Sequence, residues 1–285
     1  MYPATFDYSA PATIDEVLHL LTEHGDGAKL LAGGHSLLPL MKLRFAQPAH
    51  VVDLRHVSSL RGVRRESTAL VIGAMTTYAE LATSSDVRDA APGLTDAASH
   101  IGDPQVRNRG TIGGSIAHAD PAADLPAVML ALDASFVAVG PAGRRTIPAA
   151  DFFVDLYTTA LAANELLTDI RIPVATARTG SAYAKHPHPA SRFALVGVAA
   201  ALELERMSAR VQRLRVAVTG FGNMPLRAIA LEEALLGKTP DAEAISFAAS
   251  RIEASAADIV EGEFRLHLAR VCAEQALQKA AERAQ

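Results

Sequence analysis

Hydrophobic positions along the chain follow two different periods, so both strands and helices are expected. Short apolar or alternating runs predict strands at residues 29–31, 51–54, 62–65, 69–72, 135–139, 164–173, 193–204 and 210–219. Apolar positions three and four residues apart predict helices at residues 13–25, 36–43, 94–99, 120–132, 226–236, 241–255 and 263–281, with a short one starting at 77.

Two of these helices begin with the spacing of a capping box. Thr13 is followed three residues later by Glu16, and Thr77 is followed in the same way by Glu80. In this arrangement the hydroxyl and the carboxylate satisfy the first free N–H groups of a helix. Gly25 is the expected end of the first helix, because glycine readily takes the backbone conformation that ends helices.

Three junctions in the middle of the chain are also expected from local signals. Pro92 and Gly93 are expected to break the chain before the helix at 94–99, and residues 102–109 read as a polar connection. Asp120 followed by Pro121 predicts a helix start, with a carboxylate cap and a proline in the first turn. Residues 125–132 would continue that helix.

The order of these elements predicts an α+β protein with two domains. The composition changes near residues 174–180, between a strand that ends at Pro173 and a polar run beginning at Lys185. We therefore expect a domain of residues 1–175, with subdomains of about 1–56 and 57–175, and a second domain of residues 176–285. A chain of 285 residues is long enough for two domains.

Composition excludes several classes of protein. No apolar run is long enough to span a membrane, and the net charge of −4 gives no general attraction to nucleic acid. The single cysteine, Cys272, can form neither an internal disulfide nor an iron–sulfur cluster. The N-terminal residues lack the pattern of a secretory signal, so we expect a cytoplasmic protein.

The strongest candidate chemistry lies in two Gly-Gly segments, each followed by a serine. The first reads Ala-Gly-Gly-His-Ser over residues 32–36, and the second reads Thr-Ile-Gly-Gly-Ser over residues 111–115. A Gly-Gly pair lets backbone N–H groups converge on an anion, and a nearby hydroxyl adds another donor. Two such loops could hold the two phosphates of one dinucleotide. Each pair taken alone could instead be only a tight turn.

Several polar residues admit a simpler interpretation. Asp124 could be a solvated carboxylate in the first turn of a helix, and Lys185 is by default an exposed charge. His118, Asp120 and Asp124 could ligate a metal, but no fourth ligand is apparent. His186 and His188 are expected in a surface loop, and Cys272 as a small buried hydrophobic residue.

Taken together, the two Gly-Gly segments and Asp124, nine residues after Ser115, closely resemble the FAD-binding medium subunit of molybdenum hydroxylases, the group of carbon monoxide dehydrogenase and xanthine dehydrogenase. The resemblance covers nearly the whole chain. It implies a PCMH-type FAD-binding domain of two α/β subdomains with the flavin between them, followed by a C-terminal domain of a small, three-stranded antiparallel sheet with helices.

The resemblance also implies which residues hold FAD. The two Gly-Gly segments would bind the pyrophosphate, Asp124 would meet the adenosine end, Leu167 would pack on the cofactor and Lys185 would reach the isoalloxazine edge. Ile101 would lie near the flavin ring and Phe193 would cover its face. The full set of expected cofactor-binding residues is Ala32, Gly33, Gly34, His35, Ser36, Ile101, Thr111, Ile112, Gly113, Gly114, Ser115, Asp124, Leu167, Lys185 and Phe193.

In the function that the resemblance implies, FAD passes electrons from 2Fe-2S clusters on a small partner subunit to an external acceptor. The molybdenum cofactor would lie on a large partner subunit, and the complex would be a dimer of heterotrimers. One alternative is a self-sufficient flavin oxidase with FAD attached covalently at His35, and another is a non-catalytic nucleotide-binding assembly module. The segment around His35 lacks the Arg-Ser of the covalent flavoproteins, which favours non-covalent FAD. No Rossmann fingerprint for a second nucleotide is present.

Overall fold

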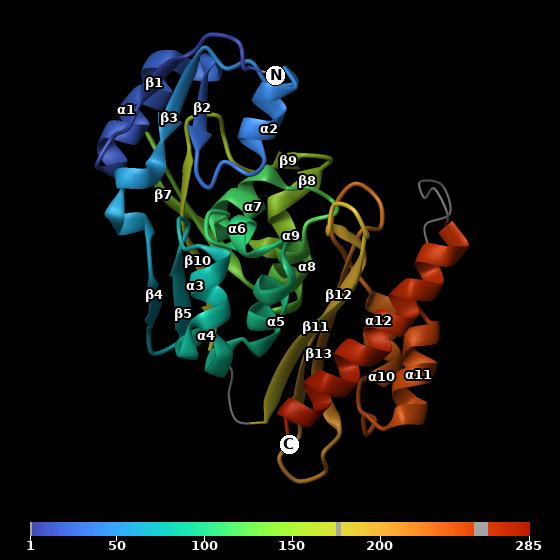
Figure 1. The fold of residues 1–285 in the computed structure, drawn as a ribbon. Helices are drawn as coiled ribbons and strands as arrows, with labels where there is room; N and C mark the ends of the chain where they lie inside the picture. Colours follow the sequence, from blue (N-terminus) through green and yellow to red (C-terminus); the bar gives the residue numbers. More distant parts are fainter. Residues whose placement is uncertain (1, 175–177, 254–261) are drawn as a thin grey trace.

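The structure is a computed structural model that describes residues 2–174, 178–253 and 262–285. Three parts follow one another along the chain and are distinct in the ribbon (Figure 1). An N-terminal subdomain lies against a larger second subdomain, and a C-terminal domain packs on the far side of the second subdomain. The predicted domain boundary falls on residues 175–177, which lie outside the described residues.

The N-terminal subdomain has a three-stranded parallel sheet and two helices, one of which precedes β2 in the sequence while the other follows it. Its elements are β1 (Asp7–Ser9), α1 (Ile14–His24), β2 (Ala28–Leu31), α2 (Leu37–Lys42) and β3 (His50–Asp53). The strand order is β1-β3-β2. The capping box of α1 is confirmed, since Thr13 accepts the Glu16 N–H and the Glu16 carboxylate accepts the Thr13 N–H, and Gly25 ends the helix.

The second subdomain is built on a five-stranded antiparallel sheet with the order β4-β5-β10-β6-β7. Its elements are β4 (Val63–Arg65), β5 (Ala69–Gly73), α3 (Tyr78–Thr83), α4 (Ser85–Ala90), α5 (Pro92–His100), α6 (Pro104–Arg107), α7 (Ile112–His118), α8 (Asp124–Ala131), β6 (Ser135–Gly140), β7 (Gly143–Pro148), α9 (Ala149–Phe152), β8 (Phe153–Asp155), β9 (Thr158–Thr159) and β10 (Leu166–Pro173).

One face of this sheet carries the largest core of the molecule. Phe136 and Ile170 from the sheet pack with Leu125 of α8 and Phe152 of α9, and all four are fully buried. Helix α8 is buried along its whole length, because it lies between this sheet and the C-terminal domain (Figure 1). A continuous apolar helix is the expected solution for such a position.

The C-terminal domain is a four-stranded antiparallel sheet, β11-β12-β13-β14, with helices against one face. Its elements are β11 (Thr179–Pro187), β12 (Ala194–Leu204), β13 (Val211–Thr219), β14 (Leu226–Arg227), α10 (Ile229–Leu235), α11 (Ala242–Ser250) and α12 (Gly262–Arg283). Helix α12 covers β11 and β12 on one face, while α5 and α8 of the second subdomain cover the other face. The implied three-stranded sheet is therefore extended by the short strand β14.

Several local predictions need correction. Pro92 and Gly93 do not break the chain but form the first turn of α5, with Pro92 at a position where no N–H is needed. The expected polar connection at 102–109 contains α6, which is capped by Asp103. The stretch predicted to begin a helix at residue 226 starts with β14, and α10 begins only at Ile229.

The predicted helix start at Asp120 is also wrong. Asp120 accepts the N–H of Ala122 in a turn, and α8 begins at Asp124. The carbonyl groups of Pro121 and Ala123 accept hydrogen bonds from the Thr219 hydroxyl, and the Ala122 carbonyl accepts the Ala194 N–H. These bonds to the C-terminal domain hold residues 120–123 in an extended turn that local signals could not indicate.

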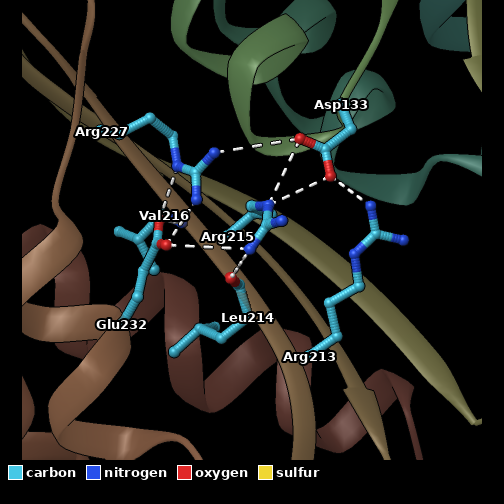
Figure 2. A network of polar contacts seen from close by, with 7 residues as sticks. All are labelled: Asp133, Arg213, Leu214, Arg215, Val216, Arg227 and Glu232. Atoms are coloured by element: carbon cyan, nitrogen blue, oxygen red, sulfur yellow. Dashed lines mark hydrogen bonds and ion pairs between the residues drawn. The ribbon is translucent and has the colours of Figure 1, made fainter. Parts of the chain in front are cut away.

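A cluster of arginines joins the C-terminal sheet to the second subdomain (Figure 2). Asp133, just after α8, pairs with Arg213 and Arg215 of β13 and lies 3.9 Å from Arg227 of β14. Glu232 of α10 binds Arg227 through both carboxylate oxygens and also accepts the Val216 N–H at 2.8 Å. The network ties α8, β13, β14 and α10 together.

No helix among the described residues is both long enough and apolar enough to cross a membrane.

Candidate cofactor site

A cavity of about 470 Å³ lies between the N-terminal and second subdomains. Both subdomains line it, and both Gly-Gly segments lie in its wall. Of the predicted cofactor-binding residues, it is lined by Ala32, Gly33, Gly34, His35, Ser36, Thr111, Gly113, Gly114, Ser115 and Leu167. Its size is within the range of small-molecule and cofactor sites. The structure thus brings together segments almost eighty residues apart in sequence.

The first Gly-Gly segment is an open turn between β2 and α2. Gly34 has a φ of +79°, a conformation that favours glycine. No residue that the structure describes accepts a hydrogen bond from the N–H groups of Gly33, Gly34, His35 or Ser36. All four residues line the cavity and none of them is buried, so their N–H groups are available to an anion bound there.

The second Gly-Gly segment is not a loop, contrary to the sequence prediction. Thr111 is the N-cap of α7, and Gly113 and Gly114 lie in the first turn of that helix. The Ile112 N–H binds the Thr76 carbonyl, the Gly113 N–H binds the Ala74 carbonyl and the Gly114 N–H binds the Thr111 hydroxyl. The donors expected to converge on an anion are therefore already used within the protein.

The first segment packs closely against the second segment and against the two residues that precede it. A Cβ added at Gly33 would lie 2.3 Å from the Arg109 carbonyl oxygen and 2.8 Å from the Gly110 Cα. A Cβ added at Gly114 would lie 3.4 Å from the Cβ of Ala32. This close approach fixes the spacing of the two subdomains across the cavity.

Tyr78, at the start of α3, supports the second segment and lines the cavity. Its ring lies so close to Gly110 that a Cβ there would approach it to 2.3 Å. Burial raises the pKa of Tyr78 to about 12, against a smaller opposing effect from a hydrogen bond with Ser115. The hydroxyl is therefore protonated at neutral pH. Sequence analysis missed this residue, although the capping box at Thr77 placed it at the first helical position.

The remaining predicted residues lie outside the cavity wall. Ile112 is fully buried in the core, and Ile101 packs against the same core from the end of α5. Asp124, Lys185 and Phe193 do not line the cavity among the residues that the structure describes. Phe193 is 45% exposed. The roles of these five residues toward a cofactor stay predictions.

Asp124 and Lys185 form a buried ion pair between α8 and β11. The Lys185 Nζ lies 3.0 Å from the Asp124 carboxylate, and both side chains are 5% exposed. Tyr183 donates a hydrogen bond of 2.5 Å to Asp124 Oδ1, and Lys185 also binds the Arg192 carbonyl. Burial raises the pKa of Asp124, while the Lys185 charge opposes that rise. The default interpretations of a solvated aspartate and an exposed lysine are both wrong.

The alternative of a metal site finds no geometric support in the described ranges. No group of three or more potential metal ligands occurs there. Asp124 is engaged by Tyr183 and Lys185, and Asp120 binds the Ala122 N–H and the Tyr157 hydroxyl. Cys272 is buried, as expected, and burial raises the pKa of its thiol to about 11.

Comparison with known proteins identifies the two domains. Residues 4–175 match the family model described as the FAD binding domain in molybdopterin dehydrogenase. Residues 181–280 match the model described as the CO dehydrogenase flavoprotein C-terminal domain.

The chain is similar to several curated medium subunits. It is 46% identical over 249 residues to the carbon monoxide dehydrogenase medium chain of Hydrogenophaga pseudoflava, covering 87% of this chain and 86% of that protein. It is 39% identical over 288 residues to the corresponding chain of Afipia carboxidovorans, covering 100% and 99% of the two chains.

Solved structures give the same result. The fold superimposes with a TM-score of 0.92 and 44% identity on a chain of the Hydrogenophaga pseudoflava carbon monoxide dehydrogenase, with 99% of both chains covered. It superimposes with a TM-score of 0.90 and 33% identity on a chain of quinoline 2-oxidoreductase from Pseudomonas putida 86, covering 100% and 99% of the two chains. The chain therefore belongs to the family of FAD-binding medium subunits of molybdenum hydroxylases, as an oxidoreductase subunit with FAD as its cofactor.

Proposed function

We propose that this chain holds FAD in the cavity between its two subdomains and passes electrons from the iron–sulfur clusters of a partner subunit through FAD to an external acceptor. The observation that carries the proposal is the meeting of both Gly-Gly segments in one cavity wall. A dinucleotide needs a central anion site with space for two ring systems, and residues of both subdomains line this cavity of about 470 Å³ together with the two segments.

The residues present fit the pyrophosphate of FAD. The N–H groups of residues 33–36, which have no acceptor among the residues that the structure describes, lie together at an open turn. Such clusters bind phosphate oxygens without a cationic side chain. Gly114 leaves the helix surface without a side chain where the cofactor would pass, and the Ser115 hydroxyl adds a donor on the same wall. The first segment therefore supplies most of the hydrogen bonds, and the second supplies clearance.

The chain's own contribution is binding and orientation. When bound, FAD supplies the capacity to exchange electrons between partners, and that chemistry belongs to the cofactor. Leu167 would pack on the cofactor from β10, while Tyr78 closes the wall behind Ser115. The buried pair of Asp124 and Lys185 would fix the C-terminal domain against the start of α8. No side chain of this chain is required to act as a general acid or base.

The proposal requires partner subunits. A chain with one cysteine cannot hold an iron–sulfur cluster, so 2Fe-2S clusters would lie on a small subunit and the molybdenum cofactor on a large subunit. We propose a dimer of such heterotrimers. Several relatives are named as subunits or medium chains of enzyme complexes, among them a subunit of the 6-hydroxypseudooxynicotine dehydrogenase complex.

The test is a titration of the purified full-length chain with FAD. We expect saturable binding with a bleachable flavin spectrum when dithionite is added, and no oxidation of carbon monoxide or N-heterocyclic substrates by this chain alone. Steady substrate turnover by the metal-free chain would contradict the proposal that substrate oxidation takes place on a partner subunit. A folded chain that binds no FAD would contradict the cofactor site and favour an assembly module.

The same preparation separates the covalent alternative. His35 lines the cavity and is exposed, so its side chain is accessible to a flavin. We expect acid precipitation to release all the flavin into the supernatant. Yellow protein in the washed pellet would instead show covalent attachment, and loss of that colour in His35→Ala would assign it to His35.

A further inference from the structure

Helix α2 carries large apolar side chains on its solvent side. Its inner side packs on the N-terminal sheet, where Met41 is buried together with Val51 of β3. On the outer side, Leu38 is 38% exposed, and at the end of the helix Leu43 is 53% and Phe45 80% exposed. A surface helix normally has polar residues on that side, and neighbouring exposed apolar groups mark interaction surfaces. Residues 38, 43 and 45 are called the apolar face of α2 below.

The turn that ends α2 fixes the backbone at Phe45. The Phe45 N–H binds the Leu40 carbonyl at 2.9 Å, and the Arg44 N–H binds the Met41 carbonyl at 3.1 Å. With Arg44 at a φ of +61°, these bonds form a Schellman motif, in which glycine commonly occupies the position of Arg44. The apolar residue that follows frequently packs back onto the helix, but Phe45 is turned to solvent. A strained residue therefore precedes an unburied aromatic ring, and strain of this kind is a reason to look for a function.

The charge around this face has one sign. Residues 27–52 contain no aspartate or glutamate but include Lys29, Lys42 and Arg44, although the whole chain has a net charge of −4. Lys42 and Arg44 are exposed and lie on either side of Leu43 in the sequence. Aromatic and arginine side chains are enriched at protein interfaces, and complementary charge steers a partner to its site. The face is suited to a partner protein that has an apolar pocket with carboxylates at its rim.

The same segment also reaches the cofactor cavity. Leu37, Leu40 and Ala46 line that cavity, so the apolar face is the outer side of part of its wall. Helices α1 and α2 lie on opposite sides of the N-terminal sheet (Figure 1), since Val52 packs with α1 and Val51 with α2. Electron transfer slows steeply with distance, so a subunit that delivers electrons to FAD must dock close to the cavity. A surface on this wall meets that requirement.

We propose that the apolar face of α2, together with Lys42 and Arg44, is the docking surface for the iron–sulfur subunit that donates electrons to this chain. The inference rests on the proposed function and adds where that partner binds. Phe45 would enter an apolar pocket of the partner, and the two cations would pair with acidic groups around it. An anionic membrane is the weaker alternative, because its recognition involves clusters of about four to eight cations.

The test uses the full-length chain, produced with an affinity tag in its native cells, and the iron–sulfur subunit that copurifies with the wild type. Phe45→Ser removes the exposed ring. Arg44→Gly removes a charge but relieves the positive φ, so this variant should unfold at a higher temperature than the wild type and yet bind the partner more weakly. Phe247→Ser is the matched control, because Phe247 is 53% exposed on α11 and does not line the cavity.

Calorimetric titration with the released iron–sulfur subunit measures the affinity of each variant. We expect Phe45→Ser to bind on the order of tenfold more weakly, and Arg44→Gly to bind more weakly with a smaller dependence on salt. Phe247→Ser should bind as the wild type does. FAD affinity of the isolated chain should be unchanged in all three. With the photo-crosslinker p-benzoylphenylalanine in place of Phe45, illumination of the complex should link this chain to the iron–sulfur subunit.

The outcomes separate this inference from the proposed function. A wild-type chain that copurifies with no iron–sulfur protein would reject both. Unchanged affinity in Phe45→Ser, with normal binding by the wild type, would reject the docking surface alone. A chain that binds the iron–sulfur subunit through this face but binds no FAD would reject the cofactor site alone.

Two further results would overturn the inference in favour of another occupant. Crosslinks from position 45 to the large subunit or to a second copy of this chain would assign the face to that protein. Binding of the wild type to phosphatidylglycerol vesicles that is lost in Phe45→Ser, with no change in affinity for the iron–sulfur subunit, would assign it to a membrane.

Discussion

The two Gly-Gly pairs, at residues 33–34 and 113–114, are alike in sequence and line the same cavity, but they differ in backbone conformation and in the hydrogen bonds of their N–H groups. The first pair lies in an open turn, with Gly34 at positive φ and with N–H groups that find no acceptor in the described part of the chain. The second pair lies in the first turn of α7, where the Ala74 carbonyl accepts the Gly113 N–H and the Thr111 hydroxyl accepts the Gly114 N–H. The first segment has N–H groups that a bound cofactor could use, whereas the second provides space for the cofactor.

The glycines within each pair also differ. Gly33 and Gly113 are required by close backbone contact, since an added Cβ would lie 2.3 Å from the Arg109 oxygen or 2.6 Å from the Ala74 oxygen. Gly34 is required by its φ, whereas Gly114 lines the cavity and an added Cβ there would meet only the Thr111 hydroxyl at 2.8 Å and the Ala32 Cβ at 3.4 Å. A repeated motif can therefore contain structural and ligand-facing glycines in alternation, and substitutions can separate the two kinds.

The largest effect is expected for Gly33→Ala. The new methyl group would overlap the Arg109 carbonyl and force the two subdomains apart, and overpacking of this kind costs about 3 kcal/mol of the free energy of unfolding. Urea unfolding of the FAD-free chain measures it. Gly27→Ala is the control, since its Cβ would meet only the Ala49 Cβ at 3.6 Å. Equal stability of the two variants would show that the subdomain contact at Gly33 is not tight.

A smaller, more selective effect is expected for Gly114→Val. The residue is helical, so no backbone strain arises, and the nearest obstacle is the Thr111 hydroxyl at 2.8 Å, whose rotation would cost no more than the N-cap bond that it accepts, about 1 kcal/mol. The fold should persist while the branched side chain fills the cavity wall. FAD affinity should fall at least tenfold, or about 1.4 kcal/mol, as measured by FAD titration with circular dichroism as the folding control. Native affinity in a folded Gly114→Val chain would mean that FAD does not pass this helix.

The smallest effect is expected for Thr111→Val. Loss of the N-cap acceptor of α7 should lower the free energy of unfolding by about 1 kcal/mol. The loss should be the same with and without saturating FAD, because the hydroxyl serves the Gly114 N–H. Thr13→Val, at the cap of α1 and away from the cavity, provides the matched comparison. A larger loss in the presence of FAD would show that Thr111 binds the cofactor directly and would make the two segments more alike than the structure indicates.

The sequence by itself determined the features that depend on neighbours in the chain. The capping boxes at Thr13 and Thr77, the hairpin of β4 and β5 and the long strands β12 and β13 all follow from signals within a few residues. The two Gly-Gly segments marked the candidate site for the same reason, since their composition alone indicates close approach of the backbone to another group.

Only the tertiary structure decided what depends on distant partners. Strands β1 and β14 are too short to be stable alone and exist because β3 and β13 pair with them. Lys185 is buried because Asp124, 61 residues earlier, supplies a carboxylate for its charge. The donors of α7 are used up because the carbonyls of Ala74 and Thr76 lie next to them. A motif specifies which groups are present, but the packing of remote segments decides which of them remain free to bind a ligand.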